Sequence, residues 1–183
     1  MSNETIEEFD LVIVGTGSGN RIPGPEFDHW KIAIVERGLF GGTCLNVGCI
    51  PSKMFVYAAD VAQIVRTADA YGIEAEVTGV NWSAIRDRVF GRIDPIVEGG
   101  ENYRLGDECP NITVIKGEGL LVGERILDIA SEDGGVRRIT GRHMVLGAGA
   151  RPFLPPYPGL TDCLLYTSPS PRDATLSRMP SSA

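Results

Sequence analysis

A short apolar segment that ends in a glycine-rich turn restricts the fold of this chain most. Residues 9–14, FDLVIV, are apolar and rich in β-branched side chains, and GTGSGN follows at once. A second apolar run, KIAIVE at residues 31–36, ends in an acid 21 residues after Gly15. Two buried strands joined through a glycine turn, with an acid ending the second strand, are typical of a dinucleotide-binding βαβ unit.

Each part of this pattern has a physical reason, but two departures weaken it. Glycines let the backbone approach a pyrophosphate, and a terminal carboxylate can accept hydrogen bonds from ribose hydroxyls. However, Asn20 stands where a G-x-G-x-x-G turn has its third glycine. The crossover RIPGPEFDHW has two prolines and no helical apolar stripe, so we expect it to be short or irregular. An ordinary tight loop is the alternative interpretation of the turn.

The remaining sequence predicts two helices followed by short strands. An apolar stripe predicts a helix over residues 53–71 that stops at Gly72. Asn81 can cap a second amphipathic helix, which Pro95 would disturb. The fold class expected is α/β, a parallel sheet with helices plus a small antiparallel meander, and the last strand can return to the parallel sheet. The later strands are expected at residues 112–117, 119–122, 125–130, 136–140 and 143–150, with turns at Gly123 and Gly134–Gly135.

Composition excludes several classes of partner. Of 183 residues, 43% are hydrophobic and 22% are charged, which is ordinary for a globular protein. A net charge of −7 leaves no basic surface for nucleic acid or an anionic membrane. The N-terminus is polar and acidic, and no apolar run reaches membrane-spanning length, so we expect a cytoplasmic protein.

Two cysteines five positions apart raise the question of chemistry. In GGTCLNVGCIPSK, Cys44 and Cys49 could be metal ligands, a structural clasp or a redox pair. A closed zinc site needs four ligands, yet the two histidines are distant in sequence and the other two cysteines are isolated. Structural disulfides are uncommon in the cytosol, so a redox pair is the favoured interpretation.

Geometry requires a break between these cysteines if they are to form a disulfide. Helix residues five apart are displaced by about 7.5 Å and point about 140° apart, whereas disulfide Cα atoms lie roughly 4.4–6.8 Å apart. Gly48 and Pro51 favour an irregular turn ahead of the next helix, which would bring the sulfurs together. A bridge over so short a loop is comparatively easy to reduce, which suits redox catalysis.

The cysteine segment resembles the redox-active motif of the flavin-dependent pyridine nucleotide-disulfide oxidoreductases, which include glutathione reductase and dihydrolipoamide dehydrogenase. The resemblance extends from FDLVIVGTGSGN through VERG to VLGAGARP. Within the family, Asn20, the crossover and CIPSKMFVYAADVA are most similar to the mycothione-reducing subgroup. On this basis residues 1–162 are the N-terminal part of a Rossmann-like FAD-binding domain that is incomplete relative to the family.

Seven residues match positions that hold FAD in this family. The resemblance implies that Glu36 binds the adenosine ribose and that Gly119 lies beside the adenine. Gly42 and Thr43 would meet the phosphates and the flavin side. The pyrophosphate would be surrounded by the glycines of the turn, Gly15, Gly17 and Gly19.

Three further residues match the family's catalytic positions. Cys49 resembles the thiol nearest the flavin, and Cys44 resembles the interchange thiol that attacks the substrate disulfide. Lys53 resembles the lysine beside flavin N5, with a solvated helix lysine as the alternative. The implied cycle carries electrons from NADPH through FAD to the cysteine pair and then to a small disulfide.

Other parts of such an enzyme are absent from this sequence. These parts are the NADPH-binding region, a later FAD-contacting acid, and the histidine–glutamate pair that acts across a homodimer. We therefore expect the chain alone to be inactive. Residues 163–183 have no period, three prolines and five serines. They resemble translated adapter read-through, so we expect a non-native or disordered tail.

Alternative functions stay open at this level. The chain could be an FAD- or nucleotide-binding module without disulfide chemistry, or a small structural or zinc-binding domain. The substrate could also be glutathione disulfide or a dihydrolipoamide-type disulfide instead of mycothione. The residues that bind the substrate would come partly from segments absent from this sequence.

Overall fold

A computed structural model describes residues 6–130, 134–150, 156 and 158–159. The chain divides into two compact units. The first consists of Met1–Gly42 and Val97–Arg151 and contains the sheet, and the second consists of Thr43–Ile96 and Pro152–Ala183. The predicted tail at residues 163–183 lies outside the described residues.

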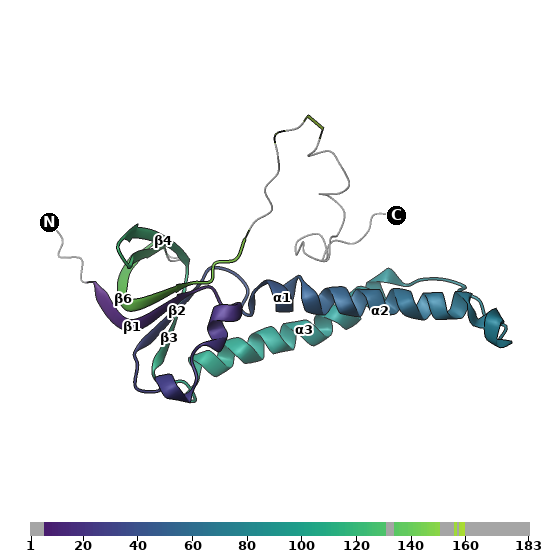
Figure 1. Cartoon of the computed structure of the whole chain (residues 1–183), viewed down its shortest axis with the longest axis horizontal. Coiled ribbons are helices and arrows are strands. Elements are labelled where there is room, and N and C mark those ends of the chain that lie inside the picture. The colour runs from purple at the N-terminus through teal and green to yellow at the C-terminus, as the bar shows by residue number, and fades with distance from the viewer. Residues whose placement is uncertain (1–5, 131–133, 151–155, 157, 160–183) are drawn as a thin grey trace. The chain divides into compact units, whose positions relative to one another are not determined.

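Three parallel strands form one half of the sheet in the first unit. β1 (Glu7–Val14) pairs with β2 (Ile32–Glu36), and β2 pairs with β3 (Ile112–Lys116). The strand order of the whole sheet is β3-β2-β1-β6-β5-β4 (Figure 1). The two strands predicted from the first 36 residues, and their parallel arrangement, are therefore confirmed.

The other half of the sheet is antiparallel. β4 (Glu118–Gly123), β5 (Ile126–Ala130) and β6 (Val136–Leu146) form a meander. β6 also pairs in parallel with β1, so the last strand returns to the parallel sheet as expected. The result is an α/β sheet with a parallel core and a small antiparallel meander.

β6 is one continuous strand, and the prediction of two strands separated near residue 141 is wrong. A Cβ at Gly141 would lie 2.8 Å from Cγ2 of Val12 on β1. The glycine therefore allows close packing between adjacent strands and does not mark a turn.

Both faces of the parallel strands are buried, which explains their unbroken apolar sequences. One face is covered partly by Phe27 and Trp30 of the β1–β2 crossover. The crossover itself contains only two 3-10 turns, Ser18–Arg21 and Pro25–Phe27, so the predicted irregular crossover is confirmed. The opposite face packs into a second cluster, made of Phe9, Val12, Ala33, Val35, Ile115, Leu127, Ile129 and Ile139.

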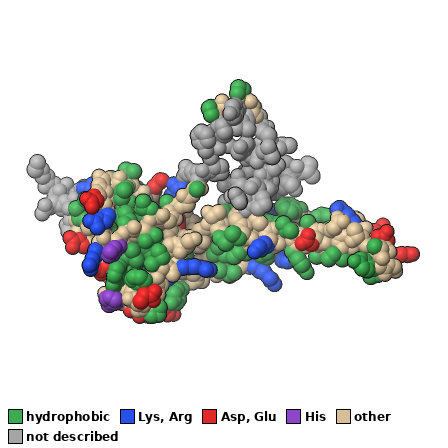
Figure 2. Space-filling view, viewed as in Figure 1, with side chains coloured by type: hydrophobic (Ala, Val, Ile, Leu, Met, Phe, Trp, Pro, Cys, Tyr) green, Lys and Arg blue, Asp and Glu red, His purple; other side chains and the backbone are tan. Residues whose placement is uncertain are grey.

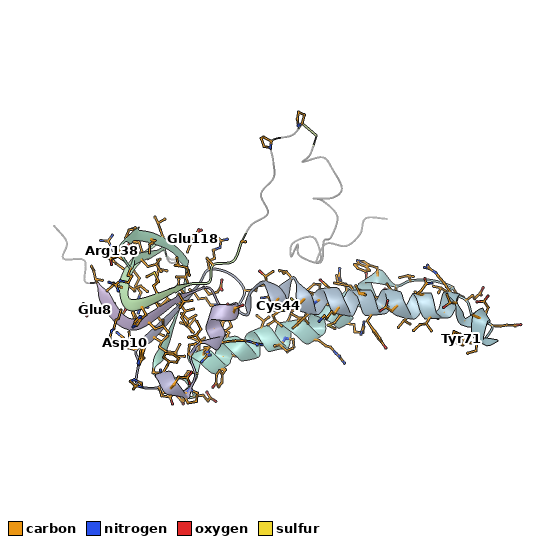
Figure 3. All side chains as sticks on the ribbon, in the orientation of Figure 1. Glu8, Asp10, Cys44, Tyr71, Glu118 and Arg138 are labelled. Carbon is orange, nitrogen blue, oxygen red and sulfur yellow. The ribbon has the colours of Figure 1, made fainter. Side chains whose placement is uncertain are left out.

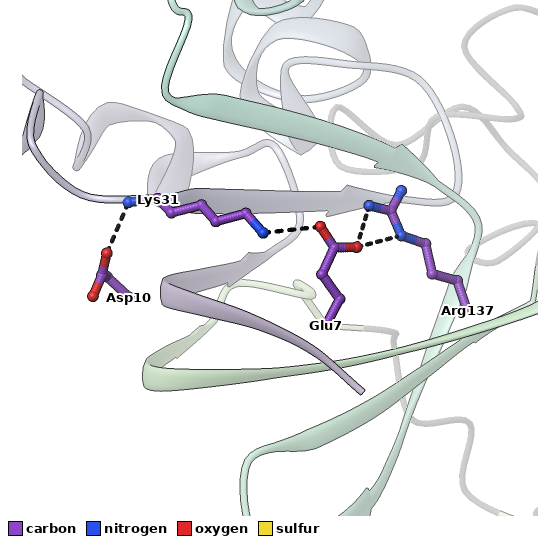
Figure 4. A network of polar contacts seen from close by, with 4 residues as sticks. All are labelled: Glu7, Asp10, Lys31 and Arg137. Carbon is purple, nitrogen blue, oxygen red and sulfur yellow. Dashed lines mark hydrogen bonds and ion pairs between the residues drawn. The ribbon is translucent and has the colours of Figure 1, made fainter. Parts of the chain in front are cut away.

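A charged network fastens the start of β1. Glu7 Oε1 lies 3.1 Å from Lys31 Nζ, and Glu7 Oε2 accepts a hydrogen bond of 3.1 Å from Arg137 Nε (Figure 4). The Lys31 backbone N–H donates to Asp10 Oδ2 at 2.8 Å. Burial raises the pKa of Glu7, but the bonds from Arg137 and Lys31 lower it more, so it lies below its usual value. The network joins β1 to the residues that begin β2 and β6.

The second unit is built on helices. α1 (Gly42–Asn46) leads to α2 (Cys49–Arg66), which begins four residues earlier than predicted. A 3-10 turn, Ala68–Tyr71, follows α2, and Gly72 ends it with a φ of 74°. The α-helix therefore ends five residues earlier than the predicted Tyr71, and Gly72 ends only the 3-10 turn, where its left-handed conformation favours glycine.

α3 (Trp82–Leu105) begins as predicted but runs further. Asn81 Oδ1 accepts the Ala84 N–H at 2.9 Å, which confirms the cap. The helix continues through Pro95, and the boundary between the two units falls one residue later.

α2 and the first half of α3 lie side by side, because Phe55 stacks on Trp82 at 5.2 Å and meets Phe90 edge-on at 6.2 Å (Figure 1).

Hydrophobic side chains are also present at the surface (Figure 2). On α2, Val56, Tyr57 and Ile64 are each more than half exposed. Among the helices that the structure describes, none has both the length and the apolar composition needed to span a membrane.

Candidate functional site

The turn after β1 brings backbone segments into close approach. Gly15 has a φ of 94°, and a Cβ there would collide with the carbonyl oxygen of Gly147, just after β6. Gly42 has a φ of 68°, and a Cβ there would collide with Gly17 Cα. Both glycines are therefore required by the fold of the turn itself.

Gly17 is different, because the described chain does not require a glycine at this position. A Cβ on Gly17 would make only an ordinary contact, 3.7 Å from Gly42 Cα. Its bare backbone leaves room on the turn for a group from outside the protein. This room is what the close approach of a pyrophosphate requires, so the turn fits a dinucleotide.

Gly19 has a packing reason to be glycine. It is buried, and a Cβ there would lie 2.9 Å from Cγ2 of Ile13 and 3.7 Å from Cγ1 of Val145. This is the role expected of the third glycine of the fingerprint, which brings the crossover close to the strands. Gly19 thus replaces the glycine missing at position 20, while its contact with a pyrophosphate stays a prediction.

Glu36, at the end of β2, is held by the glycine turn. Its Oε2 accepts hydrogen bonds from the Thr16 N–H at 2.9 Å and from the Thr16 hydroxyl at 2.7 Å. The Gly38 N–H donates to Oε1 at 2.8 Å. Burial raises the pKa of the Glu36 carboxyl, but the hydrogen bonds from Thr16 and Gly38 outweigh burial and hold the pKa below its ordinary value. The carboxylate is thus fixed and ionised beside the turn.

Thr16 also connects the turn to the segment before α1. It is 1% exposed, and its hydroxyl oxygen accepts the Gly41 N–H at 2.9 Å. Sequence reasoning missed Thr16. The available signal was a hydroxyl residue between the first two glycines of the turn, where it can reach the acid at the end of the next strand.

Gly119 is the second residue of β4, and the residues just before it contact the end of β2. The Gly117 N–H donates to the Glu36 backbone carbonyl at 3.0 Å, and Arg37 pairs with Glu118 at 2.7 Å. A Cβ on Gly119 itself would meet Leu127 at 2.9 Å, so strand packing also requires this glycine.

The cysteine segment in the second unit has the predicted break. Cys44 lies in α1, and Cys49 is the first residue of α2, with Val47 and Gly48 between the helices. A Cβ on Gly48 would lie 3.0 Å from the Thr43 carbonyl oxygen, so glycine suits this tight turn. The irregular turn between the cysteines is confirmed, whereas the disulfide itself stays a prediction.

The start of α2 explains how Pro51 is accommodated. The Ser52 N–H donates to the Gly48 carbonyl at 3.1 Å, so the helical hydrogen bonds begin just after Pro51. In the first turn of a helix a missing N–H costs little. Both cysteines are exposed, and Lys53, also exposed, follows Cys49 by one turn. Figure 3 shows Cys44 near the start of the helices and Tyr71 at their far end.

No group of three or more histidine, cysteine or acidic side chains among the described residues is arranged to hold a metal ion. The two histidines instead contact one tryptophan. Trp30 stacks on His143 at 5.3 Å, and its Nε1 donates to His29 Nε2 at 2.9 Å.

Part of the predicted site lies within the first unit, on the turn after β1, at the end of β2, at the first residue of α1 and at the start of β4. The second unit carries Thr43, Cys44, Cys49 and Lys53 on α1 and α2. The residues gathered in the first unit are Gly15, Gly17, Gly19, Glu36, Gly42 and Gly119.

A parallel sheet with a glycine turn and a fixed acid defines an α/β fold of the Rossmann-like, FAD-binding kind. Residues 9–180 match the family model described as pyridine nucleotide-disulphide oxidoreductase. The chain belongs to this family, whose members use FAD and NAD(P)H.

Individual relatives agree with this assignment. Mycothione reductase from Mycobacterium tuberculosis (strain H37Rv) is 47% identical over 157 residues, which cover 82% of this chain and 33% of that protein. Glutathione reductase from Burkholderia cepacia is 29% identical over 166 residues, covering 88% of this chain and 34% of that protein. The chain therefore spans about a third of the length of these relatives.

A solved structure supports the fold. The HOCl-induced flavoprotein disulfide reductase RclA from Escherichia coli aligns with a TM-score of 0.64 and 24% identity. The alignment covers 83% of this chain and 31% of that one. The chain is therefore a partial FAD-binding domain of the type found in flavoprotein reductases.

Proposed function

We propose that this chain is the N-terminal, FAD-binding part of a disulfide reductase that uses NADPH to reduce mycothione. The observation that carries the substrate proposal is the 47% identity with mycothione reductase, well above the 29% identity with glutathione reductase. The cysteine pair supports the reaction class, because the break between α1 and α2 means that Cys44 and Cys49 do not have the fixed separation of one regular helix.

The first unit supplies most of the proposed cofactor contacts, and Thr43 and Lys53 of the second unit supply the others. The open side of Gly17 would admit the pyrophosphate, and the carboxylate of Glu36 would bind the ribose. Gly119 is proposed to lie beside the adenine, and Gly42 with Thr43 to meet the phosphates and the flavin side. Bound FAD would supply the electron pair that NADPH delivers to the cysteine disulfide.

The cysteines would carry out two thiol–disulfide exchanges. The Cys44 thiolate attacks one sulfur of the substrate, forming a mixed disulfide and releasing the first product thiolate, which takes up a proton. The Cys49 thiolate then attacks the Cys44 sulfur, forming the Cys44–Cys49 disulfide and releasing the second product thiolate. The substrate gains two electrons and becomes two thiols, while the cysteine pair loses the same two electrons. Lys53 is proposed to contact the flavin.

The reaction class can be tested on the purified chain. After reconstitution with FAD, titration with dithionite should produce a long-wavelength absorbance band linked to the thiols. Cys44→Ser and Cys49→Ser should each alter that band, whereas Cys163→Ser, at a cysteine outside the pair and outside the described residues, should leave it unchanged. Bound FAD without any thiol-linked band would contradict the disulfide chemistry and favour a binding module. Zinc release on thiol modification would contradict both.

The substrate requires the complete protein, because the chain spans about a third of its relatives. We expect kcat/KM with NADPH to be higher for mycothione than for glutathione disulfide by at least about tenfold, since complementary polar contacts discriminate strongly. Equal values, or a preference for glutathione disulfide, would overturn the substrate proposal while leaving the class intact.

A further inference from the structure

Asn20 occupies the position of the missing fingerprint glycine, and the structure gives this asparagine a specific contact. Its backbone carbonyl accepts a hydrogen bond from Arg104 Nη2 at 2.7 Å, and its side-chain Oδ1 accepts one from Arg104 Nε at 3.0 Å. One guanidinium group therefore donates hydrogen bonds to both oxygens of Asn20. A glycine at position 20 would offer only the backbone oxygen.

Arg104 reaches a second segment with its remaining nitrogen. Nη1 donates to Cys109 Sγ at 3.5 Å, and Cys109 is 5% exposed. The Cys109 carbonyl in turn accepts the Ile112 N–H at 3.0 Å, at the start of β3. We call Arg104, Asn20 and Cys109 the Arg104 clamp. The rigid fork of an arginine suits such simultaneous contacts, which a lysine could not all make.

The glycine turn lacks the long helix that usually stabilises such a turn. In a regular dinucleotide-binding unit, a long helix follows the turn and its packing holds the glycines in place. Here only the four-residue 3-10 turn Ser18–Arg21 follows, and it has no side-chain cap. The Arg104 clamp holds the same turn from the last helical turn of α3, 84 residues away in sequence.

We propose that Arg104 is a positioning residue that holds the glycine turn in the conformation that binds the FAD pyrophosphate. The FAD part of this inference rests on the proposed function. Arg104 acts through Asn20 and touches no reacting atom. The departure from the glycine fingerprint is thus paired with a distant arginine that compensates for the absent crossover helix.

Hydrogen exchange of the FAD-free chain tests the clamp independently of the cofactor. In Arg104→Met, we expect amide exchange of residues 17–22 to accelerate by about tenfold, because the two hydrogen bonds from the guanidinium to Asn20 are lost. Arg92→Met, at an exposed position on the same helix, should leave these amides unchanged. Unchanged exchange in Arg104→Met, or faster exchange throughout the first unit, would overturn the clamp.

FAD affinity tests the functional consequence, using the quenching of flavin fluorescence. We expect the dissociation constant for FAD to rise about tenfold in Arg104→Met and less in Arg104→Lys, which keeps the charge and one donor nitrogen. Asn20→Gly should raise it about threefold, and the double variant should show less than the product of the two effects. Full additivity would overturn the inference. No FAD binding by the unmodified chain would instead refute the proposed function, and the exchange experiment would still decide the clamp.

Discussion

Thr16 contributes more hydrogen bonds at the candidate site than its size suggests. We expect Thr16→Val to lower the free energy of unfolding by about 1–3 kcal/mol, because Glu36 and the Gly41 N–H each lose a buried partner. Chemical denaturation measures this loss. Thr16→Ser, which keeps the hydroxyl, is the matched control and should retain most of the stability. Equal losses in both variants would contradict this account, because serine keeps the hydroxyl that makes the hydrogen bonds.

Glu36 should make stability depend on pH. Its pKa in the folded chain lies below the ordinary value of 4.5, because hydrogen bonds from Thr16 and Gly38 outweigh burial. The stabilisation is therefore fully present above about pH 4.5 and is lost as the pH falls through the lower folded value. The difference in unfolding free energy between the wild-type chain and Glu36→Gln should narrow as the medium becomes more acidic. If this difference in unfolding free energy did not change with pH, the lowered pKa of Glu36 would be contradicted.

The position of a single residue could be predicted where it follows from the spacing of motifs along the sequence. Glu36 could be predicted because a strand of known length follows the crossover, and the break at Gly48 because glycine and proline interrupt a helix. The roles of Thr16 and Arg104 could not be predicted, because their hydrogen-bond partners lie on segments that are distant in sequence and adjacent only in the fold. Local propensity carries no signal for a contact such as that between Arg104 and Asn20.

At the scale of elements, the two prolines in helices provide a matched pair. Pro95 lies inside α3 and cannot donate to the Gly91 carbonyl, whereas Pro51 lies in the first turn of α2. We expect Pro95→Ala to raise the free energy of unfolding by about 1–3 kcal/mol. Pro51→Ala recovers no helical hydrogen bond and should not stabilise the chain. Thermal and urea unfolding would measure both, and an unchanged Pro95→Ala variant would contradict this account.

Sequence periodicity predicted which segments form helices and strands, but it did not predict where each helix or strand begins and ends. The second helix was expected to be disturbed at Pro95, yet it continues to Leu105, with Ile93 and Val97 buried on either side of the proline. Burial of the helix face overrides the cost of the proline in this case. The two strands expected near Gly141 are one strand for a similar reason, because close packing on Val12 favours continuity.

At the scale of the whole molecule, we expect the purified 183-residue chain to show no NADPH-dependent disulfide reduction. The chain spans about a third of its relatives, and no second glycine-rich turn for NADPH occurs in the sequence. The oxidation of NADPH in the presence of a small disulfide is the measurement, with a complete disulfide reductase as the positive control. Measurable turnover that Cys44→Ser abolishes would refute this expectation.

The place of β6 beside β1 has a consequence for how this sheet forms during synthesis. β1 can pair with β2 soon after residue 36 leaves the ribosome, but its other neighbour is not complete until Leu146 has been made. Until then one edge of the central strand has no partner, with the apolar side chains of Val12 and Ile13 nearby. Such long-range closure slows folding and prolongs the exposure of a strand edge that can aggregate. For this chain the exposed strand edge persists until β6 has been synthesised.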